Sequence, residues 1–319
     1  MNKRTQLYSQ LSEASKAEIA THIEKHKLRT GRIRRGSKHR KSLKHAQPKL
    51  PLDFLAIGDS WFEYPLNGND LPFPPLPLQN FAIAADSQLG SIGNPPPHIL
   101  NLALHGQATT AVLSYEKQEQ MRDVLMDSSQ WLNEMTNLPD AILISAGGDD
   151  MAGDQFAIYL DYGGANGLDQ TRFQGILDSV QSSYMDLFAF RDIFAEGVPI
   201  VGHCYDYAIP NGVHPVCVEQ GWLQPSLDFA GYDYNKGLSI IRDAIDGFNK
   251  MFNDLATDTV LPPGKTTNNF VLVDTRNTIT RDSSFPNGWA NEIHPYPVGF
   301  TALANKFLGV LQAKFPGRI

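Results

Sequence analysis

The sequence has few cysteines and no long hydrophobic stretch. It contains 2 Cys among 319 residues, which excludes a small scaffold held together by several disulfides. No segment approaches the roughly 18 consecutive apolar residues of a transmembrane helix. Collagen-like repeats and sustained coiled-coil heptads are absent as well. What remains is a chain with 42% hydrophobic residues, enough for the core of one large domain or two ordinary ones.

Charge is distributed unevenly along the chain. Residues 1–50 hold 14 Lys and Arg against 3 Asp and Glu, a balance of +11. Residues 51–319 hold 13 against 31, a balance of −18, so the overall charge of −7 conceals the division. We therefore predict a basic N-terminal arm over residues 1–50 and an acidic globular body over residues 51–319.

The arm is predicted to be partly helical and partly disordered. Residues 1–28 have a weakly helical pattern, in which Ser15 and Glu18 have the spacing of a capping box. Residues 29–45 are rich in Lys and Arg, lack acidic residues and contain two Gly, which predicts disorder or loose docking. Partners that suit this charge are an anionic membrane surface, nucleic acid, an acidic protein or the acidic body of the same chain. No nucleic-acid recognition motif accompanies the basic residues.

The start of the chain does not have the pattern of a secretory signal, because no apolar segment of adequate length follows the first basic residues. With no transmembrane segment either, we expect a soluble cytoplasmic protein, and export by a non-classical route is left open. The oligomeric state is not predicted.

Cys204 and Cys217 are close in sequence to His203 and His214. A zinc site is conceivable there, but the paired Cys-x-x-Cys spacing of structural zinc sites is missing. We expect two unpaired, reduced thiols, and we predict neither a cofactor nor a metal in the functional site.

The body alternates short apolar segments with longer amphipathic ones. This alternation predicts an α/β fold, with parallel strands covered by helices on both faces. Helices are expected near residues 110–135, 171–196, 235–257 and 298–315. The predicted strands are Leu52–Ile57, Ile99–Leu104, Ala141–Ser145, Pro199–His203 and Asn269–Asp274.

Clusters of small and polar residues follow three of these strands, and a fourth cluster precedes the last helix. Parallel strands bring their carboxyl ends to one edge of the sheet, so the four clusters should meet there. Together they supply a serine, a histidine and glycine amides, which are the groups that acyl transfer requires. The clusters are GDSW at 58–61, NLALHG at 101–106, GGDD at 147–150 and NEIH at 291–294.

These four segments, in this order, resemble the conserved blocks of the SGNH or GDSL-like hydrolase superfamily. The resemblance covers about residues 52–315, and it implies a three-layer α/β/α fold with a five-stranded, flavodoxin-like parallel sheet. It also implies that Ser60 is the nucleophile and His294 the base. The amides of Ser60 and Gly106 would then stabilise the oxyanion. Trp61 stands where leucine is more usual in the family.

Two positions depart from the family pattern. The block-three asparagine, which donates to the oxyanion, is Asp149 here, and an ionised carboxylate cannot donate. Asp149 can donate only if burial keeps it protonated. The block-five aspartate is Asn291, which can accept a hydrogen bond from His294 but supplies no charge to stabilise an imidazolium.

Our main hypothesis is a serine ester hydrolase that acts on an acyl ester, a lipid or an acetylated substrate through an acyl-enzyme. Its catalytic residues would be Ser60, His294 and Asn291, and its oxyanion hole Ser60, Gly106 and Asp149. Trp61, Tyr205 and Asp206 are candidates for the substrate rim, and packing explains them equally well.

Alternatives remain open. Asp149 and Asp150 could form a carboxylate pair for a divalent cation or for acid–base catalysis. The two departures also fit an SGNH-fold binding protein of weakened activity, whose basic arm contacts an anionic surface or partner.

Overall fold

A computed structural model describes residues 3–42, 49–71, 79–163 and 166–319. Its centre is a five-stranded sheet of order β2-β1-β3-β4-β5, in which every neighbouring pair is parallel. This confirms the predicted α/β class and the flavodoxin-like strand order. The strands are β1 (Asp53–Gly58), β2 (His98–Asn101), β3 (Ala141–Ser145), β4 (Ile200–His203) and β5 (Phe270–Val273).

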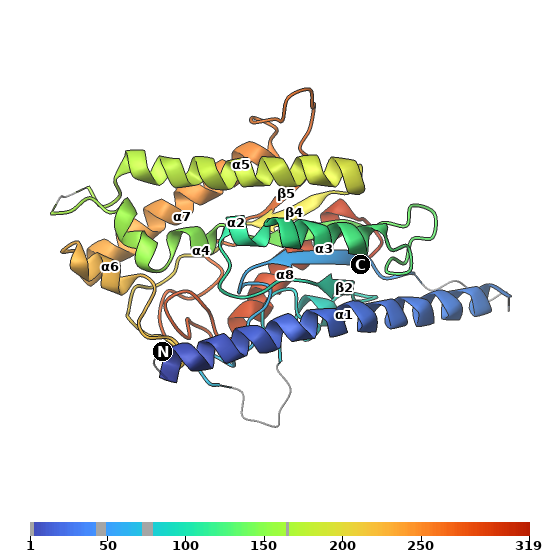
Figure 1. Cartoon of the computed structure of the whole chain (residues 1–319), viewed down its shortest axis with the longest axis horizontal. Helices are drawn as coiled ribbons and strands as arrows, with labels where there is room; N and C mark the ends of the chain where they lie inside the picture. Colours follow the sequence, from blue (N-terminus) through green and yellow to red (C-terminus); the bar gives the residue numbers. More distant parts are fainter. Residues whose placement is uncertain (1–2, 43–48, 72–78, 164–165) are drawn as a thin grey trace.

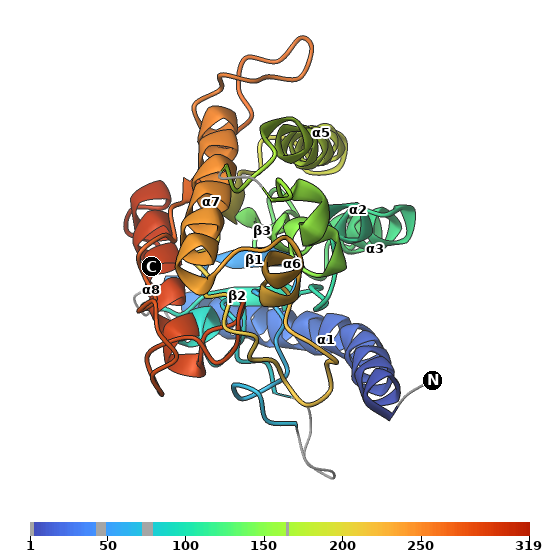
Figure 2. The same ribbon diagram turned by 90° about the vertical axis from the view of Figure 1, so that its left-hand side faces the viewer.

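Helices cover both faces of the sheet and make a three-layer molecule (Figures 1 and 2). In Figure 2, α3 and α5 lie on one side of the sheet and α8 on the other, while α7 packs against α5 and β5. The helices of the body are α2 (Thr109–Val112), α3 (Tyr115–Met126), α4 (Gly148–Met151), α5 (Gln170–Phe194), α6 (Gln224–Phe229), α7 (Tyr234–Ala256) and α8 (Pro297–Lys314). Short 3₁₀ turns span Leu89–Ser91 and Asp154–Tyr159.

Local sequence signals explain where the three longest helices of the body begin. Asp169 accepts a hydrogen bond from the amide of Arg172 and caps α5, and Asp233 caps α7 in the same way through Lys236. Pro297 opens α8, where its fixed φ suits the first turn and its missing N–H costs nothing. None of the helices in the described part of the chain has the length and apolar character that crossing a bilayer requires.

The arm forms one long helix, α1 (Lys3–Ser42), that lies along the edge strand β2 (Figure 1). Its buried positions recur at intervals of four or seven residues, which places them on one face of the helix. These residues are Leu11, Ser15, Ile19, His26 and Thr30. Covering β2 with a helix also shields the open edge of the sheet from pairing with another chain.

The prediction of disorder or loose docking from residue 29 onward is wrong for residues 29–42, which continue the helix. Residues 43–45 lie outside the described part of the chain. The predicted capping box is also wrong, because Ser15 lies inside the helix and its hydroxyl donates to Glu63, 3.4 Å away. Three of these five buried residues are polar, so the face leaves no hydrophobic stripe in the sequence by which docking could be predicted.

The basic residues of α1 partly neutralise the acidic body. Lys27 pairs with Asp127 at 3.1 Å, and Lys38 with Glu134 at 2.6 Å. Arg29 lies 3.6 Å from Asp86. One expected partner of the arm, the body of the same chain, is therefore present in the structure. The remaining part of the domain prediction, that residues 51–319 form a self-contained domain, stays a prediction.

Candidate active site

The four polar clusters meet at the carboxyl edge of the sheet, as the strand order requires. Ser60 lies two residues after β1, and Asn101 is the last residue of β2. The Asn101 side chain donates to the carbonyl of Phe62 at 2.8 Å and accepts from the amide of Ala103 at 3.0 Å. It therefore ties the serine loop to the loop that carries Gly106.

Ser60, His294 and Asn291 form a continuous hydrogen-bonded chain. The Ser60 hydroxyl lies 2.7 Å from Nε2 of His294, and Nδ1 of His294 lies 3.0 Å from Oδ1 of Asn291. All three side chains are buried. This is the arrangement of a nucleophile, a base and a group that orients the base.

The surroundings of Asn291 fix which way its amide points. Tyr64 donates its hydroxyl proton to the carbonyl of Gly68 and therefore accepts from Nδ2 of Asn291, 3.0 Å away. Asn69 donates to the carbonyl of Ala290 and accepts from the same Nδ2 at 2.9 Å. Oδ1 of Asn291 is left to accept from His294, so His294 carries its proton on Nδ1 and turns the lone pair of Nε2 toward the serine.

The His294 ring is packed tightly and shielded from water. The Tyr64 ring stacks on it with centroids 4.0 Å apart, and Trp222 meets it edge-on at 5.5 Å. Burial, and to a lesser extent the nearby His105, lowers the pKa of His294 to about 3. The imidazole is therefore neutral at physiological pH, as a base must be.

Two backbone amides belong to residues that line the space beside the serine. Gly106 has a φ of +71°, a conformation that favours glycine. In the described part of the chain, neither the amide of Ser60 nor that of Gly106 has a hydrogen-bond partner. Both residues line a cavity together with Asp149 and His294.

The Asp149 carboxyl is in a setting that favours its protonated form. Burial, followed by the nearby carboxylates of Asp59 and Asp150, raises its pKa well above the ordinary value. Its Oδ2 is buried and, among the described residues, has no hydrogen-bond partner. A protonated Asp149 can donate a hydrogen bond as the family's asparagine does.

Asp59 and Asp150 hold the surrounding loops together. Asp59 accepts from the amide of Trp61 at 2.9 Å and from the hydroxyls of Ser145 and Tyr205, and burial raises its pKa to about 6. Asp150 accepts from both the amide and the hydroxyl of Thr109. Because Asp150 is bonded in this way, the structure gives no support to Asp149 and Asp150 as a cation-binding pair.

Two cavities meet at Ser60. The first, with a volume of about 40 Å³, is mainly apolar, and the second, also of about 40 Å³, is lined by His294, Gly106 and Asp149 among others. The first is lined by Met151, Ala208, Leu223, Ile241, Ile245 and Trp289, among others. Leu11 of α1 lines the second, so the N-terminal helix forms part of the site wall.

The candidate rim residues all line the apolar cavity but are held by internal bonds. Trp61 donates to the carbonyl of Ile293 at 3.1 Å, and Tyr205 donates to Asp59. The Asp206 carboxylate accepts from four backbone amides, at Tyr207, Asn277, Thr278 and Ile279. The Asp206 carboxylate therefore holds its loop in place, whereas the rings of Trp61 and Tyr205 form part of the cavity wall.

Sequence reasoning missed the residues that support the hydrogen-bonded chain of Ser60, His294 and Asn291. Tyr64 follows the GDSW cluster closely, and that closeness was the one available signal for it. Asn69, Trp222 and Leu11 reach the site from segments with no recognisable motif. Glu292 points away from His294 and accepts from the amides of Gly212, Leu223 and Gln224.

Both cysteines are unpaired and buried, and burial raises the pKa of each thiol. His203 lies 2.9 Å from the Ser145 hydroxyl. Among the described residues, neither Cys204 nor Cys217 belongs to a cluster of three metal-ligating side chains.

Comparison with known proteins gives only distant likenesses. No protein-family model matches the sequence, and no curated protein matches it. The extracellular lipase of Streptomyces rimosus is 17% identical, with a TM-score of 0.46 over 82% of this chain and 99% of the lipase. Phospholipase A1 from Streptomyces albidoflavus NA297 is 15% identical, with a TM-score of 0.45 over 83% of this chain and 100% of its own.

A carbohydrate acetylesterase from Sinorhizobium meliloti, Est24, is 12% identical, with a TM-score of 0.44 over 83% of this chain and 100% of the esterase. At identities and TM-scores this low, the comparisons alone assign neither a family nor an activity.

Proposed function

We propose that this chain is a serine hydrolase of the SGNH kind that cleaves carboxylic esters through an acyl-enzyme. The observation that carries the proposal is the hydrogen-bonded chain from Ser60 through His294 to Asn291. A buried serine beside a neutral imidazole, with free amides next to it, is arranged for acyl transfer rather than for holding a loop.

In the first step, Ser60 Oγ attacks the ester carbonyl carbon and its proton passes to Nε2 of His294. The carbonyl oxygen becomes an oxyanion held by the amides of Ser60 and Gly106. His294 then gives the proton to the alkoxy oxygen, the carbon–oxygen bond breaks, and the alcohol leaves. A water molecule attacks the acyl-enzyme by the same route and releases the acid.

Asp149 is proposed as the third oxyanion donor, in its protonated form. Its raised pKa keeps the proton on the carboxyl, so the side chain donates where an ionised group would repel the developing charge. Asn291 is proposed to orient His294. Its amide is held by Tyr64 and Asn69, so its oxygen faces Nδ1.

The apolar cavity is proposed to hold the acyl chain. Its walls come from α4, the segment after β4 and α7, and they present aliphatic and aromatic side chains next to Ser60. A lining of this kind suits an apolar acyl group, because binding in such a pocket comes from burial of hydrocarbon.

The direct test is hydrolysis of p-nitrophenyl esters with acyl chains from two to twelve carbons. We expect the wild-type chain to release p-nitrophenol, and Ser60→Ala to lose about 10³-fold or more in kcat, because no nucleophile remains. The Ser114→Ala variant is the matched control, since Ser114 lies outside both cavities. Equal turnover by wild type and Ser60→Ala would refute the proposal.

A further inference from the structure

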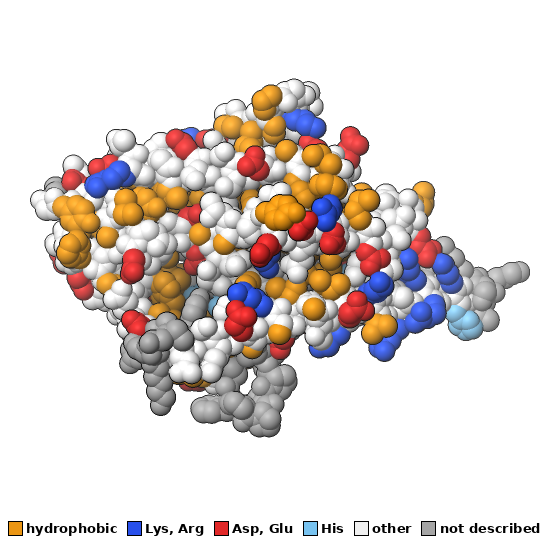
Figure 3. Space-filling view, viewed as in Figure 1, with side chains coloured by type: hydrophobic (Ala, Val, Ile, Leu, Met, Phe, Trp, Pro, Cys, Tyr) orange, Lys and Arg blue, Asp and Glu red, His pale blue; other side chains and the backbone are white. Residues whose placement is uncertain are grey.

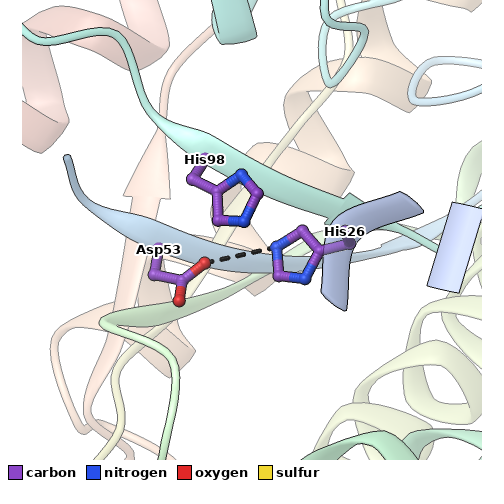
Figure 4. Close-up of side chains that lie close together, drawn as sticks. All are labelled: His26, Asp53 and His98. Carbon is purple, nitrogen blue, oxygen red and sulfur yellow. Dashed lines mark ion pairs between the residues drawn. The ribbon is translucent and has the colours of Figure 1, made fainter. Parts of the chain in front are cut away.

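A histidine–aspartate cluster joins α1 to the sheet, at the edge opposite the catalytic residues (Figure 4). Asp53 and His98 are the first residues of β1 and β2 and face each other in the strand register. His26 comes from the middle of α1 and points at Asp53. The cluster therefore connects three segments that are far apart in sequence.

The three side chains are almost completely buried, with 4%, 1% and 1% exposure for His26, Asp53 and His98. One ligand-type atom from each lies within 4.8 Å of the others. Nε2 of His26, Oδ1 of Asp53 and Nδ1 of His98 are all without a hydrogen-bond partner among the described residues. Three unpartnered buried polar atoms in one place are costly unless something binds them.

The outer hydrogen bonds show that these atoms present lone pairs. Thr30 donates its hydroxyl proton to the carbonyl of Gln130 at 2.8 Å, so it accepts from Nε2–H of His98, also at 2.8 Å. The proton of neutral His98 is then on Nε2, and its Nδ1 has a lone pair. His26 Nδ1 lies 3.2 Å from the side-chain oxygen of Gln130 and donates to it, so in neutral His26 the lone pair is on Nε2.

Nε2 of His26 and Oδ1 of Asp53, two atoms with lone pairs, lie 3.3 Å apart. Such a contact requires a cation between them, either a proton or a metal ion. We propose that the cluster binds one Zn²⁺ ion through His26, Asp53 and His98. Ligands of tetrahedral zinc, at about 2.0–2.1 Å from the ion, lie roughly 3.3–3.4 Å from one another, close to the observed contact.

The outer shell also fits a metal site. Histidines that bind zinc donate their other ring N–H to a carbonyl or another acceptor, which fixes the tautomer. Here Gln130 and Thr30 do this for His26 and His98. Asp53 is anchored through its second oxygen, which accepts from the amide of Leu132 at 2.5 Å.

Zinc binding requires one movement. The two imidazole rings are stacked, with centroids 3.8 Å apart and an interplanar angle of 5°, so one ring must turn to bring both lone pairs to the same ion. A cavity of about 520 Å³, lined by His26 and His98 among others, lies beside the cluster. Lys25 and Arg29 also line this cavity, together with Asp86.

The proposed ion would clamp the N-terminal helix to the sheet. Because the ligands come from α1, β1 and β2, metal binding would be coupled to docking of the helix. The site lies at the amino ends of the strands, away from Ser60, so its role would be structural.

The test uses the full chain freed of metal by chelation and dialysis. Calorimetric titration with ZnCl₂ should show one Zn²⁺ per chain, and Zn²⁺ should raise the Tm, whereas Mg²⁺ and Ca²⁺ should not. Asp53→Asn and His26→Asn should weaken Zn²⁺ binding by at least about 100-fold. His39→Ala, which removes an exposed histidine of the same helix, should bind as wild type does.

A measurement on the wild type keeps the proposal testable if these variants do not fold. X-ray absorption at the zinc edge should show N/O ligands at about 2.0–2.1 Å with imidazole scattering. Sulfur ligands at about 2.3 Å would place the ion at a cysteine and overturn the proposal. The proposal would also be overturned if Zn²⁺ left the Tm unchanged while acidification raised it. That result would show that a proton alone joins His26 to Asp53.

Discussion

At the scale of single residues, the two departures from the SGNH pattern fit their surroundings. Asn291 donates to Tyr64 and Asn69 while it accepts from His294, and only an amide can do all of this. Asp149 is buried beside two other carboxyls, which raises its pKa and favours the protonated form. These observations favour a site in which Asn291 and Asp149 are functional over a site that has lost its activity.

The pH profile should reveal both groups. The pKa of His294 is lowered to about 3, so the base stays neutral and kcat/KM should hold on the acid side until the pH approaches that value. The pKa of Asp149 is raised, so its proton is lost as the pH rises, and the oxyanion hole then loses a donor and gains a charge. We expect kcat/KM to fall on the alkaline side.

Asp149→Asn should abolish the fall of kcat/KM at alkaline pH, since an amide donates at every pH. At lower pH, the activity of this variant should change little. Asp149→Ala should lose about 10²–10³-fold in kcat throughout. The measurement is kcat/KM for a p-nitrophenyl ester between pH 4 and 10. An alkaline fall that persists unchanged in Asp149→Asn would show that Asp149 is not its cause.

Asn291→Asp should lower the stability and the activity of the protein, although it brings back the residue of the SGNH pattern. The carboxylate would face the side-chain oxygen of Asn69, and no donor would replace the lost amide bond to it. We expect a lower Tm and a lower kcat, and the double variant Asp149→Asn with Asn291→Asp should also be less active than wild type. A large gain in turnover by the double variant would instead favour decay and a binding role.

At the scale of elements, the sequence predicted the strands to within a few residues, because each is a compact apolar segment. The predicted second strand, Ile99–Leu104, was too long at its end. Asn101 turns its side chain back to the amide of Ala103, and the strand ends there. The four clusters could be placed at one edge because parallel strand topology decides where strand ends lie.

The course of α1 could not be predicted. Its docking depends on buried polar contacts, such as Ser15 with Glu63 and Thr30 with Gln130, and their partners lie far along the chain. The support of Asn291 by Tyr64 and Asn69 was hidden for the same reason. Periodicity shows where an apolar face lies, but it carries no information about which polar groups will meet.

The segment after β4 should control the length of the acyl group. Ala208 lines the apolar cavity, and Ala208→Leu adds three carbon atoms to it. We expect activity on an eight-carbon ester to fall by about tenfold or more relative to a two-carbon ester, since each methylene in an apolar pocket changes discrimination by about 10-fold or more. Ala313→Leu, an exposed site on α8, is the matched control. An unchanged ratio in Ala208→Leu would place the acyl chain elsewhere.

At the scale of the whole molecule, the basic and acidic parts of the sequence occupy different parts of the structure. The carboxyl-terminal end of α1 projects beyond the body, and Figure 3 shows Lys and Arg gathered on that end. Arg32 and Arg35 are among its exposed residues. The opposite end of the same helix lines the cavity at Ser60 through Leu11.

We predict that this basic end binds anionic membrane surfaces. The wild-type chain should sediment with vesicles that contain phosphatidylserine, and binding should weaken as salt is raised. Arg32→Glu with Arg35→Glu should lose most of this binding, whereas Lys314→Glu on the body should not. Equal binding by the double variant, or binding to nucleic acid alone, would contradict the prediction.

The account depends most directly on Ser60 as an activated nucleophile. A fluorophosphonate probe reacts with such a serine, and mass spectrometry identifies the modified residue. We predict stoichiometric labelling of the wild type at Ser60, much slower labelling of His294→Ala, and none of Ser60→Ala. Labelling of the wild type that does not exceed that of Ser60→Ala would contradict the account.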